Sequence, residues 1–194
     1  MDKKDIKRDK IISSAAKVFG REGFRKTRMN DIAKEAGMGK SSIYHYFISK
    51  EEIFEAVVEK EANYLKSEII NATREVNDPC KRMKAYVFAR MKAFNTSINL
   101  YNAVKTNYLN HLPFIERVRK KYDKEEKKMV SAILKDGIRK KIFAVSNVEL
   151  ATIAIVTAIK GLEIPMLIKE NTTETERRAE QLLTFLFYGI TSKS

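Results

Sequence analysis

The sequence contains few of the residues that would indicate a secreted or β-sheet protein. Cys80 is the only cysteine among 194 residues, so no internal disulfide can form and an extracellular disulfide framework is excluded. There are only three prolines and seven glycines, and period-2 alternation of apolar and polar residues is hard to find. We therefore expect an all-α protein.

Long apolar runs are also lacking. The longest candidate, residues 145–168, is interrupted by Asn147, Glu149, Lys160 and Glu163, so it is not expected to span a bilayer. The first ten residues, MDKKDIKRDK, contain no apolar stretch of the kind found in signal peptides. We expect a soluble, cytoplasmic protein.

Acidic side chains are too few to balance the basic ones, above all near the N terminus. The formal net charge is +13, and residues 1–50 contain 13 Lys and Arg against 6 Asp and Glu, a net charge of +7. A basic end of this kind indicates a polyanionic partner, either nucleic acid or an anionic membrane. Charge alone does not choose between these partners, and a merely solvated lysine-rich surface is a third interpretation.

Helical periodicity and capping signals run through most of the chain and predict about nine helices. The first covers about residues 4–21, and two short helices, 29–36 and 40–47, are joined by a turn at Gly37. A capping box at Ser49-x-x-Glu52 predicts the start of a long helix that runs to about residue 75. Later helices are expected at 79–98, 114–139, 148–162 and 173–188. We place a domain boundary near Lys50, between residues 1–50 and residues 51–194.

Residues 33–47, AKEAGMGKSSIYHYF, are too polar for a core helix and too aromatic for a linker. Two short helices joined by a tight glycine turn suggest a helix-turn-helix. Ile43 and Phe47 would hold the second helix down, which leaves a polar outer face. Lysine, serine and tyrosine side chains are common phosphate contacts, and a helix of this size fits a DNA major groove.

Four sequence features resemble the signature of the TetR family of bacterial transcriptional regulators: Thr27, Ile32-Ala33, the run from Ala36 to Phe47, and Lys50-Glu51. The match covers about residues 8–58, and the rest of the chain resembles the family in length, helix content and layout. The resemblance implies a homodimer, a palindromic operator and a C-terminal ligand pocket. It thus implies a ligand-responsive regulator, a repressor released by a small, largely apolar or amphipathic effector. Gly39 and Ser41 depart from the pattern, which puts the bases that are read in doubt.

The residues predicted to contact DNA lie at helix starts and on the outer face of the helix at 40–47. They are Thr27, Arg28, Lys40, Ser41, Ser42, Tyr44, His45, Tyr46 and Lys50. Thr27 is also predicted to cap the helix at 29–36. His45 falls at the variable position of the family motif, so it is predicted to influence base preference.

Two further groups of residues are predicted for the larger domain. Residues that surround the family's ligand cavity, although each could simply be core, are Arg90, Phe94, Ile98, Tyr101, Tyr108 and Phe114. Residues too apolar to be left exposed on the last two helices are Ile153, Val156, Ile159, Leu182, Phe185 and Leu186, and we expect them in a four-helix dimer interface.

The sequence gives no sign of catalysis. No His, Cys, Asp and Glu cluster has metal-ligand spacing and no nucleophile–base pair stands out, so we expect no enzymatic activity, metal or cofactor. A basic scaffold that binds anionic membranes is the alternative. A membrane-binding helix should present Leu, Phe or Trp, whereas the helix at 40–47 presents Ser, Lys and His, so we expect no membrane partner.

Overall fold

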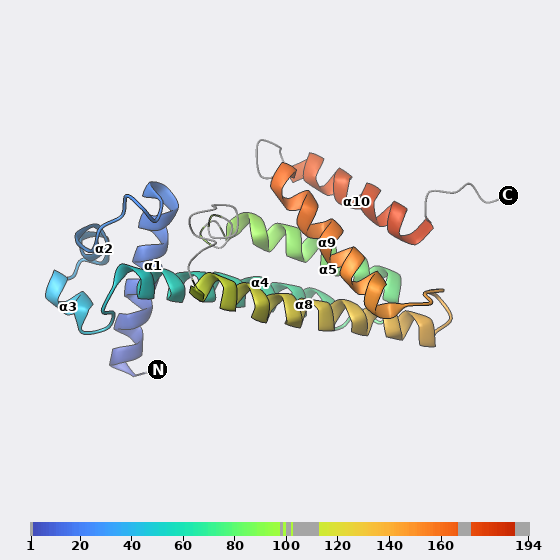
Figure 1. Ribbon diagram of the computed structural model, residues 1–194, viewed down its shortest axis with the longest axis horizontal. Coiled ribbons are helices and arrows are strands. Elements are labelled where there is room, and N and C mark those ends of the chain that lie inside the picture. Colours follow the sequence, from blue (N-terminus) through green and yellow to red (C-terminus); the bar gives the residue numbers. More distant parts are fainter. Residues whose placement is uncertain (1, 98, 100–101, 103–112, 167–171, 189–194) are drawn as a thin grey trace. The chain divides into compact units, whose positions relative to one another are not determined.

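The computed structural model describes residues 2–97, 99, 102, 113–166 and 172–188, and in these residues the protein is all-helical, as predicted (Figure 1). The eight helices found there, with no strand, are α1 (Lys3–Glu22), α2 (Met29–Ala36), α3 (Lys40–Tyr44), α4 (Lys50–Thr73), α5 (Pro79–Thr96), α8 (Pro113–Arg139), α9 (Val148–Met166) and α10 (Thr172–Tyr188). The predicted bounds agree to within four residues; α3 ends three residues before the expected 47 and α9 ends four residues after the expected 162.

The chain forms two compact units, each made of two stretches of sequence. The first unit contains residues 1–64 and 97–120, and the second contains residues 65–96 and 121–194. Helices α4 and α8 each contribute residues to both units. The domain boundary near residue 50 stays a prediction.

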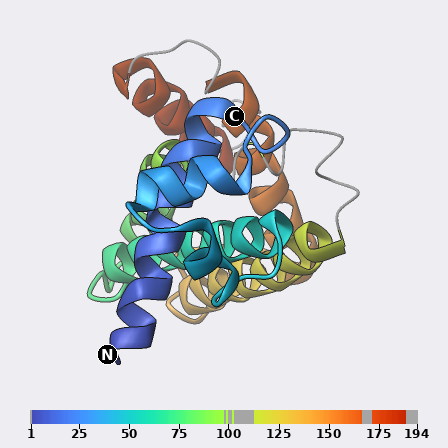
Figure 2. The same ribbon diagram turned by 90° about the vertical axis from the view of Figure 1, so that its left-hand side faces the viewer.

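The first unit is built around the apolar face of α1. Figures 1 and 2 show α2 and α3 on the same side of α1. Residues fully buried in this unit include Ile11, Val18, Phe19, Ile32, Ile43 and Phe47. The rings of Phe19 and Phe54 meet edge to face with centroids 5.0 Å apart, and Phe114 packs on Phe54 at 6.1 Å. This aromatic packing ties α1 to the first turns of α4 and α8 and so fixes the base on which α2 and α3 sit.

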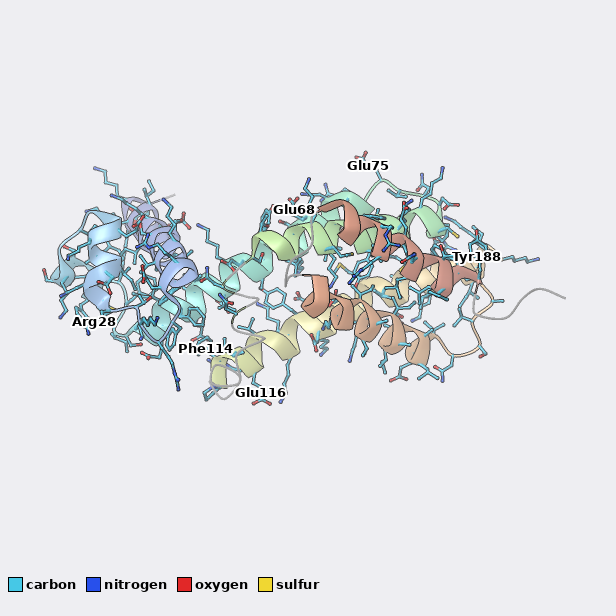
Figure 3. All side chains as sticks on the ribbon, turned by 90° about the horizontal axis from the view of Figure 1, so that it is seen from above. Arg28, Glu68, Glu75, Phe114, Glu116 and Tyr188 are labelled. Carbon is cyan, nitrogen blue, oxygen red and sulfur yellow. The ribbon has the colours of Figure 1, made fainter. Side chains whose placement is uncertain are left out.

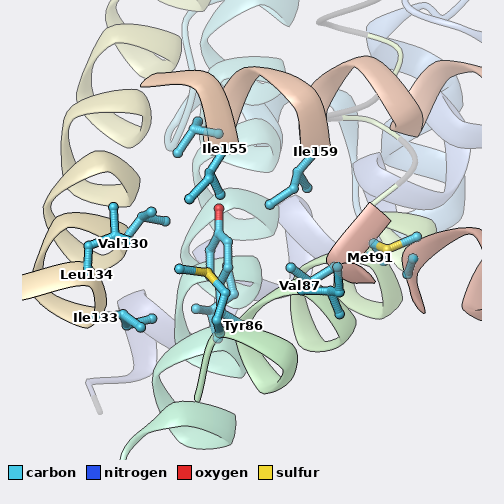
Figure 4. Close-up of a cluster of buried hydrophobic side chains, with 13 residues drawn as sticks. Tyr86, Val87, Met91, Val130, Ile133, Leu134, Ile155 and Ile159 are labelled. Atoms are coloured by element: carbon cyan, nitrogen blue, oxygen red, sulfur yellow. The ribbon is translucent and has the colours of Figure 1, made fainter. Parts of the chain in front are cut away.

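The second unit has its own apolar core, in which α5, α8, α9 and α10 pack together (Figure 4). Its most deeply buried residues include Tyr86, Val87, Val130, Val156, Ile159 and Ala179. Val156 and Ile159 are 2% and 1% exposed, so both point into this core. The prediction that these two residues form a dimer interface is therefore wrong. The other face of α9 is the one that is exposed.

The end of α8 requires a glycine. A Cβ on Gly137 would lie 2.1 Å from the ring of Phe143, far inside van der Waals contact. The backbone N–H groups of Ile142 and Phe143 both donate to the Gly137 carbonyl, at 2.8 and 3.1 Å. Lys141 takes a left-handed conformation with φ of 58° to make this turn. The chain thus folds back so that Phe143 covers Gly137 directly.

Candidate nucleic-acid interface

The turn between α2 and α3 is set by Gly37, which adopts the left-handed conformation with φ of 62°. Its N–H donates to the Lys34 carbonyl at 3.0 Å, and the N–H of Met38 donates to the Ala33 carbonyl at 3.0 Å. These two bonds close the C terminus of α2, and glycine accepts the positive φ without steric cost. The chain is thereby redirected within three residues into α3.

Helix α3 ends at Tyr44, three residues earlier than the sequence predicted. The N–H of Tyr46 donates to the Ile43 carbonyl at 2.9 Å, and the N–H of Phe47 donates to the same oxygen at 3.0 Å. This tighter turn brings the side chain of Phe47 into the core, where it is 1% exposed. His45 and Tyr46 therefore lie in the turn after α3 rather than on the helix.

The outer face of α3 and its following turn carries polar side chains. Lys40, Ser41, Tyr44 and His45 are exposed, whereas Ser42 and Tyr46 are partly buried. The Lys40 ammonium lies 5.9 Å from the centroid of the Tyr44 ring, and Tyr44 itself is 45% exposed. Most of the predicted DNA-contacting residues are thus brought together on one surface, with Ile43 buried behind them. This surface can donate several hydrogen bonds and offers one aromatic ring for packing.

The start of α2 differs from the prediction. Thr27 is 1% exposed and its hydroxyl donates to the Gly23 carbonyl at 2.8 Å, as does its own N–H at 3.3 Å. The N-cap residue is Arg28, whose N–H donates to the Asp31 carboxylate at 2.8 Å. The predicted cap by Thr27 is therefore wrong, because its hydroxyl closes the loop instead. In this conformation Thr27 has no donor left for a phosphate, whereas the exposed Arg28 does (Figure 3).

Lys50 braces the loop that precedes α2. Its ammonium donates to the carbonyls of Phe24 and Thr27, at 2.8 and 3.1 Å, and lies 4.4 Å from the centroid of the Phe24 ring. Sequence reasoning assigned Lys50 to phosphate and missed this role, since the two carbonyls lie 26 and 23 residues away in the chain. One ammonium hydrogen remains for another acceptor.

An open groove is lined by the end of α1, the loop before α2, and α2 itself. It is lined by three basic and three acidic residues, namely Arg21, Glu22, Lys26, Asp31, Lys34 and Glu35. Glu22 accepts a hydrogen bond from Arg21 at 2.9 Å, which raises the pKa of that guanidinium. Because its charges balance, this groove offers little attraction to a polyanion, in contrast to the surface of α3.

The predicted ligand site is only partly described. Ile98, Tyr101 and Tyr108 lie outside the described residues, as does the side chain of Phe94. Phe114 is in the aromatic core of the first unit. Arg90 belongs to the second unit, where it is 3% exposed and donates to Glu126 from Nε and Nη2. The Arg90 guanidinium therefore serves a buried ion pair in this structure.

Glu126 is the centre of a buried polar network. Tyr86 donates its hydroxyl to Glu126 at 2.7 Å, and the Lys160 ammonium lies 3.4 Å from the same carboxylate and also contacts Asp123. Burial alone would raise the pKa of Glu126, but the charge and hydrogen bond of Arg90, the charge of Lys160 and the Tyr86 hydroxyl outweigh it and lower that pKa. Burial and the Glu126 charge raise the pKa of Tyr86 well above its ordinary value. The network therefore holds Glu126 ionised and Tyr86 protonated.

Apart from the buried Val156 and Ile159, the predicted dimer residues divide into two groups. Ile153 on α9 and Phe185 on α10 are 41% and 59% exposed, and Leu150 and Tyr188 are exposed on the same helices. Leu182 and Leu186 are half-buried and pack against the core of the second unit. The exposed apolar residues of α9 and α10 remain available to a second protein surface, unlike Val156 and Ile159.

Within the part of the chain that the structure describes, no three His, Cys, Asp or Glu side chains gather as metal ligands. The described helices include none with the length and apolarity that crossing a membrane requires.

Comparison with known proteins gives a consistent match. The family model described as bacterial regulatory proteins, tetR family, matches residues 11–57, which contain α2, α3 and the start of α4. The repressor KstR2 of Mycolicibacterium smegmatis is 27% identical over 68% of this chain and 65% of its own length. The activator FasR of the same organism is 33% identical over 44% of this chain and 39% of its own length. This chain thus aligns with less than two thirds of either relative.

Solved structures resemble the chain over nearly its whole length. The regulator FadR from Bacillus subtilis, in complex with stearoyl-CoA, superposes with a TM-score of 0.74 over 94% of this chain and 99% of that one, at 21% identity. At this identity the likeness concerns the fold, which is a helix-turn-helix module followed by a larger helical region.

Proposed function

Because the chain belongs to the TetR family of bacterial transcriptional regulators, we propose that it is a ligand-responsive repressor that binds a palindromic operator as a dimer. The observation that carries this proposal is the surface of α3. Lys40, Ser41, Tyr44 and His45 are exposed together on a helix whose inner residue, Ile43, is fully buried. Such a surface has little to bury against protein, and it suits a DNA groove. Residues 1–50 would then be the DNA-binding domain and residues 51–194 the ligand-binding and dimerisation domain.

In this proposal α3 enters the major groove and the flanking cations hold the backbone. Ser42 and His45 face base edges, and Ser41, Tyr44 and Tyr46 contact the nearest phosphates. Arg28 and Lys40 contact phosphates, and Lys50 adds its remaining hydrogen while it holds the loop before α2. Phosphate contacts position the helix, whereas contacts to base edges carry sequence preference.

Two copies of α3 require a dimer and a matching operator. The exposed apolar faces of α9 and α10, with Ile153 and Phe185, support pairing of these two helices with the same helices of a second copy. A two-fold dimer places its reading helices in successive major grooves. The operator should therefore be a pseudo-palindrome with half-sites about one helical turn, ~34–36 Å, or slightly more apart.

The effector is proposed to bind residues 51–194 and to lower operator affinity. Ile98, Tyr101 and Tyr108 supply apolar and aromatic residue types that suit a largely apolar or amphipathic molecule. A long-chain acyl-CoA is the first effector to test, since the structurally similar FadR from Bacillus subtilis was solved with stearoyl-CoA. The effector needs only a higher affinity for the conformation in which the two α3 helices no longer fit the operator spacing.

The direct test is selection of bound sequences from a random DNA library, followed by release with candidate effectors. Enrichment of a palindrome, and its release by an acyl-CoA but not by CoA alone, is the expected result. Binding that is limited by salt and enriches no palindrome would overturn the proposal. A reporter gene downstream of the selected operator then separates repression, in which expression rises when the effector is added, from activation.

A further inference from the structure

The first turns of α1 sort their charges onto different sides of the helix. At 100° per residue, Asp2, Asp5 and Asp9 fall within an arc of about 60°, and Lys3, Lys7 and Lys10 fall within a second arc of about 60°. The centres of the two arcs lie about 140° apart. The basic side of α1 is therefore separated from its acidic side although the sequence alternates the two charges.

The acidic side is occupied by contacts within the protein. Asp9 accepts from the Lys60 ammonium at 2.7 Å, and Asp5 accepts from the Asp2 N–H at 3.4 Å. The basic side is different. Lys3, Lys4 and Lys7 are exposed and make no hydrogen bond or ion pair with any described residue. Their charge is thus uncompensated within the described part of the chain.

Two basic residues from the first turns of α1 lie next to the two ends of α3. Arg8 places its guanidinium over the ring of Phe47, 4.8 Å from the centroid, just after α3 ends. Lys10 places its ammonium beside the turn before α3, 4.0 Å from the position that a Cβ on Gly37 would take. Lys10 belongs to the arc of Lys3 and Lys7, whereas Arg8 lies about 130° from the centre of that arc. The two contacts therefore locate the first turns of α1, rather than one side of them, beside α3 within the same compact unit.

We propose that the basic first turns of α1 form a second phosphate-binding surface that grips the DNA backbone beside the groove entered by α3. Lys3, Lys7 and Lys10 supply one side of this surface, and Lys4 and Arg8 supply the face that continues the buried residues of α1. The proposal rests on the proposed function, since it adds a contact to the same DNA complex. Arg8 and Lys10 fix the surface relative to α3, and Lys3, Lys4 and Lys7 extend it along the backbone. The contact is to phosphates, so it raises affinity for every sequence rather than selecting one.

An anionic membrane would attract the same charges, but the apolar part of a membrane-binding helix is lacking. Ile6 is the only large apolar residue exposed on the first two turns of α1, and its neighbours on the surface are charged. Helices that lie in a membrane interface bury a continuous apolar face. DNA phosphate, which requires charge alone, is therefore the better match.

The test compares two triple variants that remove the same charge. The first replaces Lys3, Lys4 and Lys7 by Ala. The control replaces Lys81, Lys127 and Lys128, three exposed lysines of the second unit, by Ala. Both are exposed helical positions, so circular dichroism melting should be unchanged. Binding to the selected operator and to a scrambled duplex of equal length is measured from about 50 to about 300 mM salt. Phosphate contacts dominate the salt dependence of the affinity in this range.

The α1 variant should bind both duplexes roughly 100-fold more weakly near 100 mM salt, with a log–log salt slope reduced by about 3, and the control should match wild type. A wild-type slope in the α1 variant would overturn the inference while leaving the proposed function intact. Failure of the wild-type protein to select any DNA sequence would overturn the proposed function instead. A loss of binding to vesicles of phosphatidylglycerol and phosphatidylcholine, with DNA binding unchanged, would assign this surface to membranes.

Discussion

The hydroxyl of Tyr86 donates to the carboxylate of Glu126 at 2.7 Å inside the second unit, 40 residues apart in the sequence. Arg90, one turn further along α5, donates to the same carboxylate. A buried charge is tolerated only when it is paired and its lone pairs are satisfied. Glu126 therefore links α8 to two successive turns of α5 through polar contacts inside the second unit.

Replacing Glu126 by Gln should destabilise the protein by about 3 kcal/mol, because it leaves the Arg90 guanidinium buried without its counter-charge. Denaturant unfolding measures the loss. Glu180→Gln is the matched control, since Glu180 forms an exposed pair with Lys84 and its loss should cost less than about 1 kcal/mol. Equal effects of the two substitutions would contradict the importance of the buried network.

Wild type and the Glu126→Gln variant should also differ in how their stability depends on pH. Burial opposes ionisation of Glu126, but Arg90, Lys160 and Tyr86 outweigh burial and lower the pKa of Glu126 in the folded state. The contribution of Glu126 to stability is therefore complete above the unfolded pKa of about 4.3. This contribution is lost as the pH falls through the lower folded pKa. The difference in unfolding free energy between wild type and Glu126→Gln should thus shrink below about pH 4.3. A difference that grows in acid would show the opposite sign and refute the assignment.

Gly137→Ala should destabilise the protein by about 1–3 kcal/mol, since its Cβ would overlap the ring of Phe143. In a Phe143→Ala background the ring is absent, and the same substitution should become neutral or stabilising by up to about 1 kcal/mol through helix propensity. A double-mutant cycle by urea unfolding measures this change of sign. Additive effects would mean that Phe143 does not cover Gly137.

The variants Lys40→Ala and Lys50→Ala should distinguish phosphate binding from stabilisation of the loop before α2. Alanine at either position should weaken operator binding by about 1–3 kcal/mol. Only Lys50→Ala should also lower the thermal stability, by about 1 kcal/mol, because the Phe24 and Thr27 carbonyls lose their donor. Differential scanning fluorimetry with a binding titration distinguishes the two. Unchanged stability of Lys50→Ala would argue that the loop holds its shape without Lys50.

His45 should affect which sequence is bound more than how tightly DNA is bound. It is exposed in the turn after α3, at the variable position of the family motif, and it is proposed to read base edges. Repeating the library selection with His45→Ala should return an altered half-site at one or two positions, whereas Tyr44→Ala should return the same half-site with lower affinity. An unaltered half-site for His45→Ala would place base readout elsewhere on α3.

The dimer prediction rests on exposed apolar residues of α9 and α10. Light scattering of the wild-type protein should give twice the 22.4 kDa mass of one chain. Ile153→Asp or Phe185→Asp should shift the measured mass toward that of the monomer, because either substitution would bury a charge in the dimer interface. Ile142→Asp, at a residue of similar exposure outside α9 and α10, is the control and should leave the mass unchanged. A dimer that survives both interface substitutions would locate the interface on another surface.

Local signals in the sequence sufficed for the helices and for the polar surface of α3. Gly37, the capping box at Ser49 and Glu52, and the periodic apolar residues of α1 each act within a few positions, so their consequences can be inferred without knowing the fold. The contacts of Lys50 could not be inferred in this way, because its partners are more than 20 residues distant and backbone carbonyls leave no trace in a sequence.

Two other errors have a similar physical origin. Helix α9 is apolar on more than one side, with Ile153 exposed and Val156 and Ile159 buried, so its periodicity does not tell which side meets the core. Arg90 was predicted to surround the ligand cavity, and the structure shows its guanidinium paired with a carboxylate 36 residues later in the chain. In each case the outcome depends on which helix is packed against the residue, and that is a property of the tertiary structure.

The sharing of α4 between the two compact units has a consequence for how the protein unfolds. Ile53, Phe54 and Val57 bury one end of this helix in the first unit, and Ile69 buries the other end in the second. An unbroken helix propagates its hydrogen bonds cooperatively, so fraying at one end exposes backbone amides toward the other. Amides in the middle of α4 should therefore exchange their hydrogens only when either unit opens. Their protection reports the stability of the weaker of the two.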